Sequence, residues 1–255
     1  MVSISVMRIM GITESLIKLQ DALDASKKAY YVRFGDGDSL MLNKSIKRDN
    51  RNKQENTREL RKELHESLNI NEPFYLRAAS GSYPIEPGMV DGLFAPFYNR
   101  EDLDVILTQQ LDEPTEELFN PILFHYLGVF APKVLTAFID RNIRHRSTMF
   151  IGSCSKEAME KFFGKIKYYV ETPSGNSYGA IQAFWPQVEK FSSDVDNIIL
   201  ATGQTSKVLA KRLWKINAEV HCIDIGSIVD PLDGKFNTRT CWKMKGREVR
   251  SYFNG

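Results

Sequence analysis

One stretch decides how we interpret this chain: Tyr30-Tyr31-Val32-Arg33-Phe34-Gly35-Asp36-Gly37-Asp38. Its first five residues are mainly aromatic and apolar, which predicts a short buried strand over 30–34. Gly35 ends that strand, and the glycine between the two aspartates lets the backbone turn tightly. The stretch therefore brings the carboxylates of Asp36 and Asp38 together at the end of a strand.

Two neighbouring carboxylates repel each other unless a positive charge lies between them. A hard divalent cation, held by one or two carboxylates and by the phosphates of a substrate, meets that need. Asp36 and Asp38 therefore predict a site for Mn²⁺ or Mg²⁺ and chemistry on a nucleotide-activated substrate. Asp-Gly is also typical of a hairpin turn, in which case residues 39–42 form a second strand. The pattern alone leaves both interpretations open.

Strand and helix signals alternate along the rest of the chain. Apolar runs predict further strands at 74–78, 148–152, 166–171, 197–201 and 220–225. Helices are predicted, mostly from apolar residues at helical spacing, at 12–25, 50–67, 116–144, 156–164 and 207–216. This alternation is typical of an α/β fold: a Rossmann-like, mostly parallel, doubly wound sheet with flanking helices. No stretch has the composition of a linker, so we expect one domain over 1–255.

Glycine and polar side chains follow two of the predicted strands. Gly152 ends one of them, and Gly203, Gln204 and Thr205 follow another, each shortly before a predicted helix. The free N–H groups at a helix N-terminus bind phosphate well where small residues let it approach. Either turn is also compatible with an ordinary capped connection. Ligands of such sheets gather at the carboxyl ends of the strands, which adds Asp224 to the same predicted region.

Composition limits the class of protein. Of the 255 residues, 42% are hydrophobic, and no apolar run reaches the 18 residues or so of a membrane-spanning helix. The N-terminus lacks the basic segment and cleavage site of a signal peptide. The three cysteines form neither a zinc motif nor a disulfide framework, which favours a reducing compartment. We therefore expect a cytoplasmic protein without a membrane span.

Basic residues are clustered although the net charge is only +2. Residues 44–53 carry five basic side chains, 141–146 carry three arginines and a histidine, and 235–250 carry six basic side chains. Such clusters bind nucleic acids, nucleotides or acidic glycans, or simply form solvated surfaces. In the last cluster, Arg239 is our candidate for a phosphate contact, because its planar guanidinium suits phosphate oxygens.

The motifs together resemble a known family. Residues 33–38, Arg-Phe-Gly-Asp-Gly-Asp, resemble the Arg-(Phe/Tyr)-Gly-Asp-Gly-Glu signature of the GT-D fold glycosyltransferases. The blocks at 150–154, 200–205 and 223–227 follow in the order that this family shows, so the resemblance extends over roughly 30–230. It implies a Rossmann-like fold and transfer of a hexosyl or pentosyl group from a nucleotide sugar, typically a UDP-sugar. It also implies a divalent metal at Asp36 and Asp38.

The sequence departs from the family pattern at two positions. Asp38 stands where the family has Glu, which leaves an oxygen ligand on a shorter arm, and Ser227 stands where the family often has His. The donor-binding positions that we expect are Arg33, Gly35, Gly152, Gly203, Gln204, Thr205 and Arg239. The acceptor is not specified by the resemblance, and a glycan, a glycoprotein and modified DNA all stay open.

An inverting glycosyltransferase also needs a base for the acceptor hydroxyl. Asp224 and Asp230 are candidates beside Glu86 and Asp91, and the sequence does not choose among them. The four histidines form no recognisable constellation, so we assign none of them to catalysis. Two rival hypotheses stay open: an Asp-x-Asp phosphatase with Asp36 as nucleophile and Asp38 as acid, and a non-enzymatic nucleic-acid-binding module that uses the basic clusters.

Overall fold

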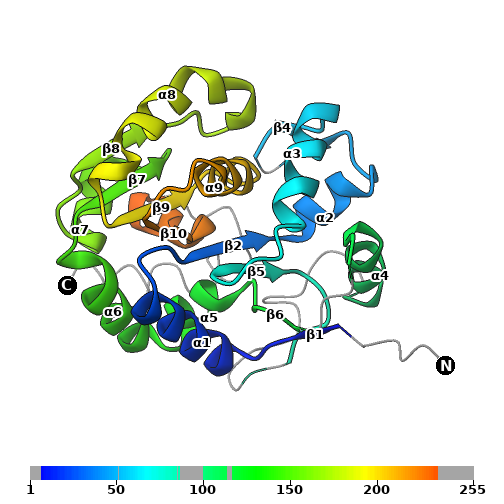
Figure 1. Ribbon diagram of the computed structural model, residues 1–255, viewed down its shortest axis with the longest axis horizontal. Coiled ribbons are helices and arrows are strands. Elements are labelled where there is room, and N and C mark those ends of the chain that lie inside the picture. The colour runs from blue at the N-terminus through cyan, green and yellow to red at the C-terminus, as the bar shows by residue number, and fades with distance from the viewer. Residues whose placement is uncertain (1–6, 51, 85, 87–99, 114–116, 235–255) are drawn as a thin grey trace.

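A six-stranded parallel sheet forms the centre of the protein (Figure 1). The computed structural model describes residues 7–50, 52–84, 86, 100–113 and 117–234. The strand order is β5-β2-β10-β9-β7-β8, and every neighbouring pair is parallel. The bounds are β2 Tyr30–Phe34, β5 Tyr75–Ala79, β7 Thr148–Gly152, β8 Tyr168–Glu171, β9 Asn197–Ala201 and β10 His221–Asp224. This architecture confirms the predicted Rossmann-like α/β fold.

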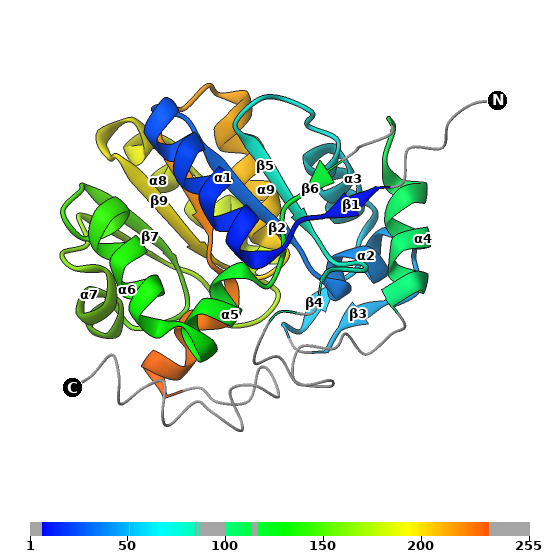
Figure 2. The same ribbon diagram turned by 90° about the horizontal axis from the view of Figure 1, so that it is seen from below.

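Helices cover both faces of the sheet (Figures 1 and 2). One face carries α1 Ile12–Ala25, α5 Leu123–Phe130 and α6 Pro132–Ile139, and the other carries α3 Arg58–Leu68, α8 Ile181–Phe191 and α9 Thr205–Lys215. The remaining long helices are α4 Arg100–Gln110 and α7 Lys156–Phe163, and a π-helical turn spans Asp140–Arg144. No helix in the described ranges is both long and apolar enough to cross a membrane.

Strand β2 shows why this sheet is buried on both sides. Its five residues are all buried, as expected of a central parallel strand. Successive side chains point to opposite faces. Tyr30 packs edge-on against Trp214 of α9, whereas Tyr31 packs edge-on against Phe124 of α5. The aromatic side chains of Tyr30 and Tyr31 therefore connect the sheet to both helical layers.

A helix, not a second strand, follows the first aspartate. Helix α2 spans Asp36–Leu42, which excludes the hairpin interpretation of the Asp-Gly pair. The carboxylate of Asp38 accepts a hydrogen bond from the Gly35 N–H at 2.7 Å, and both acids lie in the first turn, where the helix dipole favours negative charge. Leu40, Met41 and Leu42 are buried. Helix α2 thus has both aspartates of the predicted metal site in its first turn.

A small hairpin lies beside α2, and its second strand falls within residues 50–67, for which a helix had been predicted. Strands β3 Arg48–Asp49 and β4 Gln54–Glu55 are antiparallel, and α3 begins only after Thr57, whose side chain accepts a hydrogen bond from Leu60 N. Two further short strands, β1 Arg8–Ile9 and β6 Glu117–Leu118, pair parallel to each other. In the predicted helix 116–144, β6, α5, α6 and the π-helical turn follow one another.

Candidate active site

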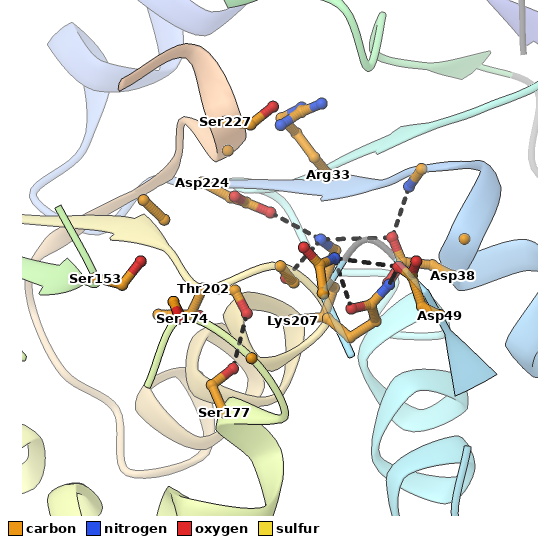
Figure 3. Close-up of a pocket in the computed structure, with 18 of the residues that line it drawn as sticks. Arg33, Asp38, Asp49, Ser153, Ser174, Ser177, Thr202, Lys207, Asp224 and Ser227 are labelled. Carbon is orange, nitrogen blue, oxygen red and sulfur yellow. Dashed lines mark hydrogen bonds and ion pairs between the residues drawn. The ribbon is translucent and has the colours of Figure 1, made fainter. Parts of the chain in front are cut away.

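Three neighbouring strands, β2, β10 and β9, end at one hollow with a volume of about 210 Å³, which we call the strand-end pocket (Figure 3). Its wall is formed by the start of α2, the β3–β4 hairpin, the loop after β8, the turn after β9 and the segment after β10. The pocket therefore lies at the carboxyl ends of the strands, where parallel sheets of this type bind ligands.

Asp36 and Asp38 both line the strand-end pocket, in different surroundings. Asp36 is partly exposed, and its Oδ1 accepts a hydrogen bond from Gly37 N at 3.0 Å. Asp38 is only 4% exposed, and burial raises the pKa of its carboxyl to about 6, although the Lys207 ammonium and the Gly35 N–H both oppose that shift. Asp38 is still mainly ionised at pH 7.

Lys207 lies between two of the carboxylates, as Figure 3 shows. It comes from the first turn of α9 and is 5% exposed. Its Nζ is 3.5 Å from Asp38 Oδ2 and 3.2 Å from Asp224 Oδ2, and it donates a hydrogen bond to Gly203 O at 3.0 Å. One ammonium therefore faces carboxylates from the start of α2 and from the end of β10.

The hairpin is joined to the turn after β9 by a set of polar side chains. Gln204 Nε2 donates to Asp49 Oδ2 at 2.6 Å, and Asn52 Nδ2 donates both to Asp49 Oδ2 at 3.1 Å and to Gln204 Oε1 at 3.0 Å. All three residues line the strand-end pocket. These contacts fix one wall of the pocket from an element that lies far away in the sequence.

Two glycines allow close approach at the pocket. Gly203 has φ +60, and a Cβ there would lie 2.8 Å from Asn52 Nδ2. Gly226 has φ +62, and a Cβ there would lie 1.7 Å from Arg33 Nη1. The Arg33 guanidinium therefore lies directly on Gly226 and is held by a hydrogen bond from its Nε to Pro121 O at 2.6 Å. Side chains would strain both backbones and displace these neighbours.

The loop after β8 is attached to the turn after β9 by hydroxyl groups. Ser177 Oγ donates to Thr202 O at 3.1 Å and lies 2.7 Å from Thr205 Oγ1. Thr205 is fully buried and is not among the residues that line the pocket. Its hydroxyl therefore holds the pocket wall in place, and a direct ligand contact by Thr205 stays a prediction.

The other predicted site residues have different positions. Arg33, Gly35, Gly203, Gln204, Asp224 and Asp230 line the pocket, together with Asp36 and Asp38. Gly152 does not, and it lies buried in β7 against the Phe150 ring. Glu86 accepts a hydrogen bond from Ile12 N at 2.7 Å, at the start of α1. Arg239 and Asp91 lie outside the described residues.

One histidine comes close to the pocket from an unexpected direction. His125 of α5 is buried, and its Nε2 lies 3.0 Å from Oγ of Ser227, which lines the pocket. Ser227 occupies the position where the resembled family often has His. An imidazole thus contacts this position from a different helix.

Sequence reasoning missed Lys207, Asp49 and Asn52. A signal existed for Lys207, because a lysine four residues after Gly203 falls on the first turn of the helix, directly before the apolar run 208–210. Asn52 lies in a polar segment that had been assigned to the helix 50–67, and Asp49 lies just before that helix, in the basic cluster 44–53. No local pattern indicates that this segment folds back onto the strand ends.

Asp36 and Asp38 could hold a divalent cation whose remaining ligands come from a substrate. Asp38 Oδ1 is a buried oxygen without a hydrogen bond to any described residue, whereas Asp224 Oδ2 pairs with Lys207 Nζ at 3.2 Å. A buried polar atom such as Asp38 Oδ1 calls for a partner. In the described part of the chain, no group of three or more His, Cys, Asp and Glu side chains is placed to hold a metal by itself. A metal at Asp36 and Asp38 therefore needs further oxygen ligands, such as phosphate and water.

The fold and the pocket define a Rossmann-like α/β protein with a polar ligand site at the carboxyl ends of its strands. Solved structures with this fold include two that are described as glycosyltransferases. A domain of unknown function 1792 with "a distinct glycosyltransferase fold" is 19% identical, with a TM-score of 0.65 over 95% of this chain and 83% of that one. "A New Glycosyltransferase (DUF1792) from Streptococcus sanguinis" is 18% identical, with a TM-score of 0.65 over 94% of this chain and 85% of the other.

These similarities establish the fold, because identities below 20% do not carry residue roles from one chain to the other. No protein-family model matches the sequence, and no curated protein does. The chain therefore has the fold of these glycosyltransferases, and its activity has to be argued from its own pocket.

Proposed function

We propose that this protein is a metal-dependent glycosyltransferase that moves a sugar from a nucleotide-sugar donor, a UDP-sugar in the first instance, to an acceptor hydroxyl. One observation carries the proposal: a pocket at the carboxyl ends of β2, β9 and β10 that combines Asp36 and Asp38 with the buried ammonium of Lys207. The glycosyltransferase-type fold supports it.

The charge of the pocket supports the metal dependence. Five aspartates line it, namely Asp36, Asp38, Asp49, Asp224 and Asp230, against the positive charges of Arg33 and Lys207. A diphosphate entering so acidic a pocket needs additional positive charge. Asp36 and Asp38 would hold Mn²⁺ or Mg²⁺, which would supply that charge and Lewis-acid stabilisation of the leaving diphosphate.

The chain's own cations also suit the departure of a diphosphate. As the bond between sugar and diphosphate stretches, negative charge gathers on the leaving group. Lys207 and Arg33 both line the pocket and are held in place, Lys207 by Gly203 O and Arg33 by Pro121 O. Because these contacts already order the two side chains, little reorganisation is needed when the charge develops.

Between the two aspartates after β10, Asp230 suits the role of base better. Asp224 is 1% exposed and pairs with Lys207, which keeps it from an acceptor. Asp230 is partly exposed and lines the same pocket, with Cys154 Sγ at 3.8 Å from its Oδ1. We therefore assign the acceptor proton to Asp230 and a positioning role to Asp224.

A second hollow gives the acceptor a place beside the donor. It is lined by Arg48, Lys53, Glu55 and residues 173–176, and it shares Pro173, Ser174 and Gly175 with the strand-end pocket. A glycan, a glycoprotein and modified DNA remain the acceptor classes to be tested.

Arg239 remains our candidate for a further phosphate contact. The two described cysteines, Cys154 and Cys222, are buried and form no disulfide within the described residues, which supports our proposal of a cytoplasmic location.

The surroundings of Asp38 favour a glycosyltransferase over a phosphatase. In an Asp-x-Asp phosphatase the second acid must give up a proton. Here Asp38 is 4% exposed, and its Oδ2 is already engaged by the Gly35 N–H and the Lys207 ammonium, although burial raises the pKa of its carboxyl to about 6. We infer from these contacts that Asp38 helps to hold a cation rather than donates a proton.

The test is a panel of nucleotide sugars, each with Mn²⁺ or Mg²⁺, scored for release of the nucleoside diphosphate. We expect release from one donor class, and UDP-sugars are tried first. Release of inorganic phosphate from small phosphoesters without nucleotide release would establish the phosphatase instead. Salt-sensitive DNA binding without turnover of any donor would establish the nucleic-acid-binding module.

A further inference from the structure

Lys207 is a buried ammonium at the position where a cation is expected. It lies within ion-pair distance of Asp38 and Asp224, and all three side chains are at most 6% exposed. Burying two carboxylates without a counter-charge is costly, so the ammonium already does part of what a metal would do for them. With two carboxylates and one ammonium, this trio has a net charge of −1.

The trio still has acceptor capacity. Asp38 Oδ1 makes no hydrogen bond to a described residue, whereas Asp224 Oδ2 pairs with Lys207 Nζ at 3.2 Å. A divalent cation that approaches Asp38 Oδ1 is attracted by the carboxylate and repelled by the nearby ammonium. Lys207 thus weakens the attraction that the pocket has for a free metal ion. A diphosphate brings negative charge of its own and attracts both cations at once.

We propose that Lys207 is the resident cation of the strand-end pocket and makes metal binding depend on the diphosphate of the donor. In the donor-free protein the ammonium neutralises Asp38 and Asp224, and the divalent ion binds weakly. When a nucleoside diphosphate enters, the metal is held between its phosphates and the aspartates. The diphosphate half of this inference rests on the proposed function, whereas the half that concerns the free metal does not.

The first experiment measures Mn²⁺ binding without nucleotide, by titration calorimetry or by the electron paramagnetic resonance signal of free Mn²⁺. Lys207→Gln changes the charge of the trio from −1 to −2, and we expect it to bind Mn²⁺ at least tenfold more tightly than the parent. Lys207→Arg keeps the charge and is expected to behave as the parent. The double variant Lys207→Gln/Asp224→Asn restores the charge of −1 and is expected to return close to the parent affinity.

Lys211→Gln is the matched control. Lys211 lies one turn further along α9, is 4% exposed, and pairs with Glu63 and Glu66 away from the strand-end pocket. The Lys211→Gln variant loses the same charge from an equally buried lysine, and we expect no change in its Mn²⁺ affinity. If Lys207→Gln binds Mn²⁺ less than threefold more tightly than the parent, or if Lys211→Gln gains as much, the inference is overturned.

The second experiment starts with the parent protein, so its main result does not depend on any variant folding. Mn²⁺ is titrated in the presence of UDP, with ADP and GDP in parallel. We expect at least one of them to raise the Mn²⁺ affinity of the parent at least tenfold, and to raise that of Lys207→Gln much less. Equal gains in both proteins would contradict the role of Lys207. If the parent binds UDP without any gain in Mn²⁺ affinity, the dependence on diphosphate is refuted. If no nucleotide binds at all, the proposed function fails, while the metal-only titrations still decide whether Lys207 limits the free metal.

Discussion

Asp36 and Asp38 are two residues apart, yet the helix gives them separate tasks. Asp36 is partly exposed at the first position of α2, where water and a substrate can reach it. Asp38 is buried, caps the Gly35 N–H and faces Lys207. A change of either residue should therefore affect activity, but only a change of Asp38 should also affect the fold.

Asp36→Asn and Asp38→Asn test this difference. Removing either charge weakens metal binding, and we expect nucleotide release to fall on the order of 100-fold in both variants. Asp36→Asn should leave the thermal unfolding midpoint near the parent value. Asp38→Asn should lower the free energy of unfolding by about 1–3 kcal/mol, because a buried charge-assisted contact is lost. Parental turnover in both variants would show that the site is elsewhere.

His221 is a second residue whose position has a measurable consequence. It is buried in β10, and burial, assisted by the charge of Arg146, lowers the pKa of its imidazole to about 4. The unfolded chain protonates this histidine near its ordinary pKa of about 6.5. Between pH 6.5 and about 4 the unfolded state therefore binds more protons, and the free energy of unfolding falls as the pH falls.

His221→Phe removes that proton linkage. We expect the stability difference between parent and variant to change by about 2 kcal/mol between pH 7 and 4, after allowance for solvent screening. The comparison has to be made against the parent at each pH, because the raised pKa of Asp38 acts in the opposite direction. His145→Gln, at an exposed position, is the control. Parallel pH curves for parent and His221→Phe, in urea unfolding, would contradict the prediction.

Among the elements, regular ones were predictable and short ones were not. The bounds predicted for β2, β7, β9 and α1 are those observed, because each combines clear periodicity with a glycine or polar boundary. The β3–β4 hairpin was not predicted, and its second strand was assigned to the helix 50–67, because its polar residues carry no period of two. Helix α2 escaped prediction because its seven residues begin with Asp-Gly-Asp, and its stability comes from a local cap and buried leucines.

The hairpin contacts the turn after β9 through Asp49 and through the amide side chain of Asn52. Asn52 donates to both Asp49 and Gln204, so it joins the hairpin to the turn after β9. We expect Asn52→Ala to raise the donor KM several-fold while kcat and the unfolding midpoint change little, since the residue is partly exposed. Asn43→Ala, at an exposed position after α2, is the matched control. An unchanged KM for Asn52→Ala would make this wall of the pocket a structural feature only.

At the scale of the whole molecule, the parallel sheet explains why so much of the site was predictable. All six strands run the same way, so residues that follow β2, β9 and β10 meet at one edge. Gly203, Gln204 and Asp224 were expected beside Asp36 because ligands gather at the carboxyl ends of parallel strands, and all four residues line the pocket, whereas their contact with a ligand stays a prediction. Asp49 and Asn52 were not expected there, since their contacts depend on how a hairpin packs in three dimensions, which no local pattern encodes. Lys207 was missed although its place in the first helical turn after Gly203 was a signal.

The last prediction concerns the whole molecule and its dependence on a metal. Chelation should abolish nucleotide release, because the acidic pocket then repels the donor diphosphate, and Mn²⁺ or Mg²⁺ should restore it. The fold should be unaffected, because Lys207 already pairs with Asp38 and Asp224. We therefore expect the thermal unfolding midpoint in excess chelator to stay within about 2 °C of its untreated value, less than the shift that roughly 1 kcal/mol produces in a protein of this size. Full nucleotide release in excess chelator would remove the metal role of Asp36 and Asp38, whereas loss of the fold on chelation would show that Lys207 is not sufficient to neutralise the buried carboxylates.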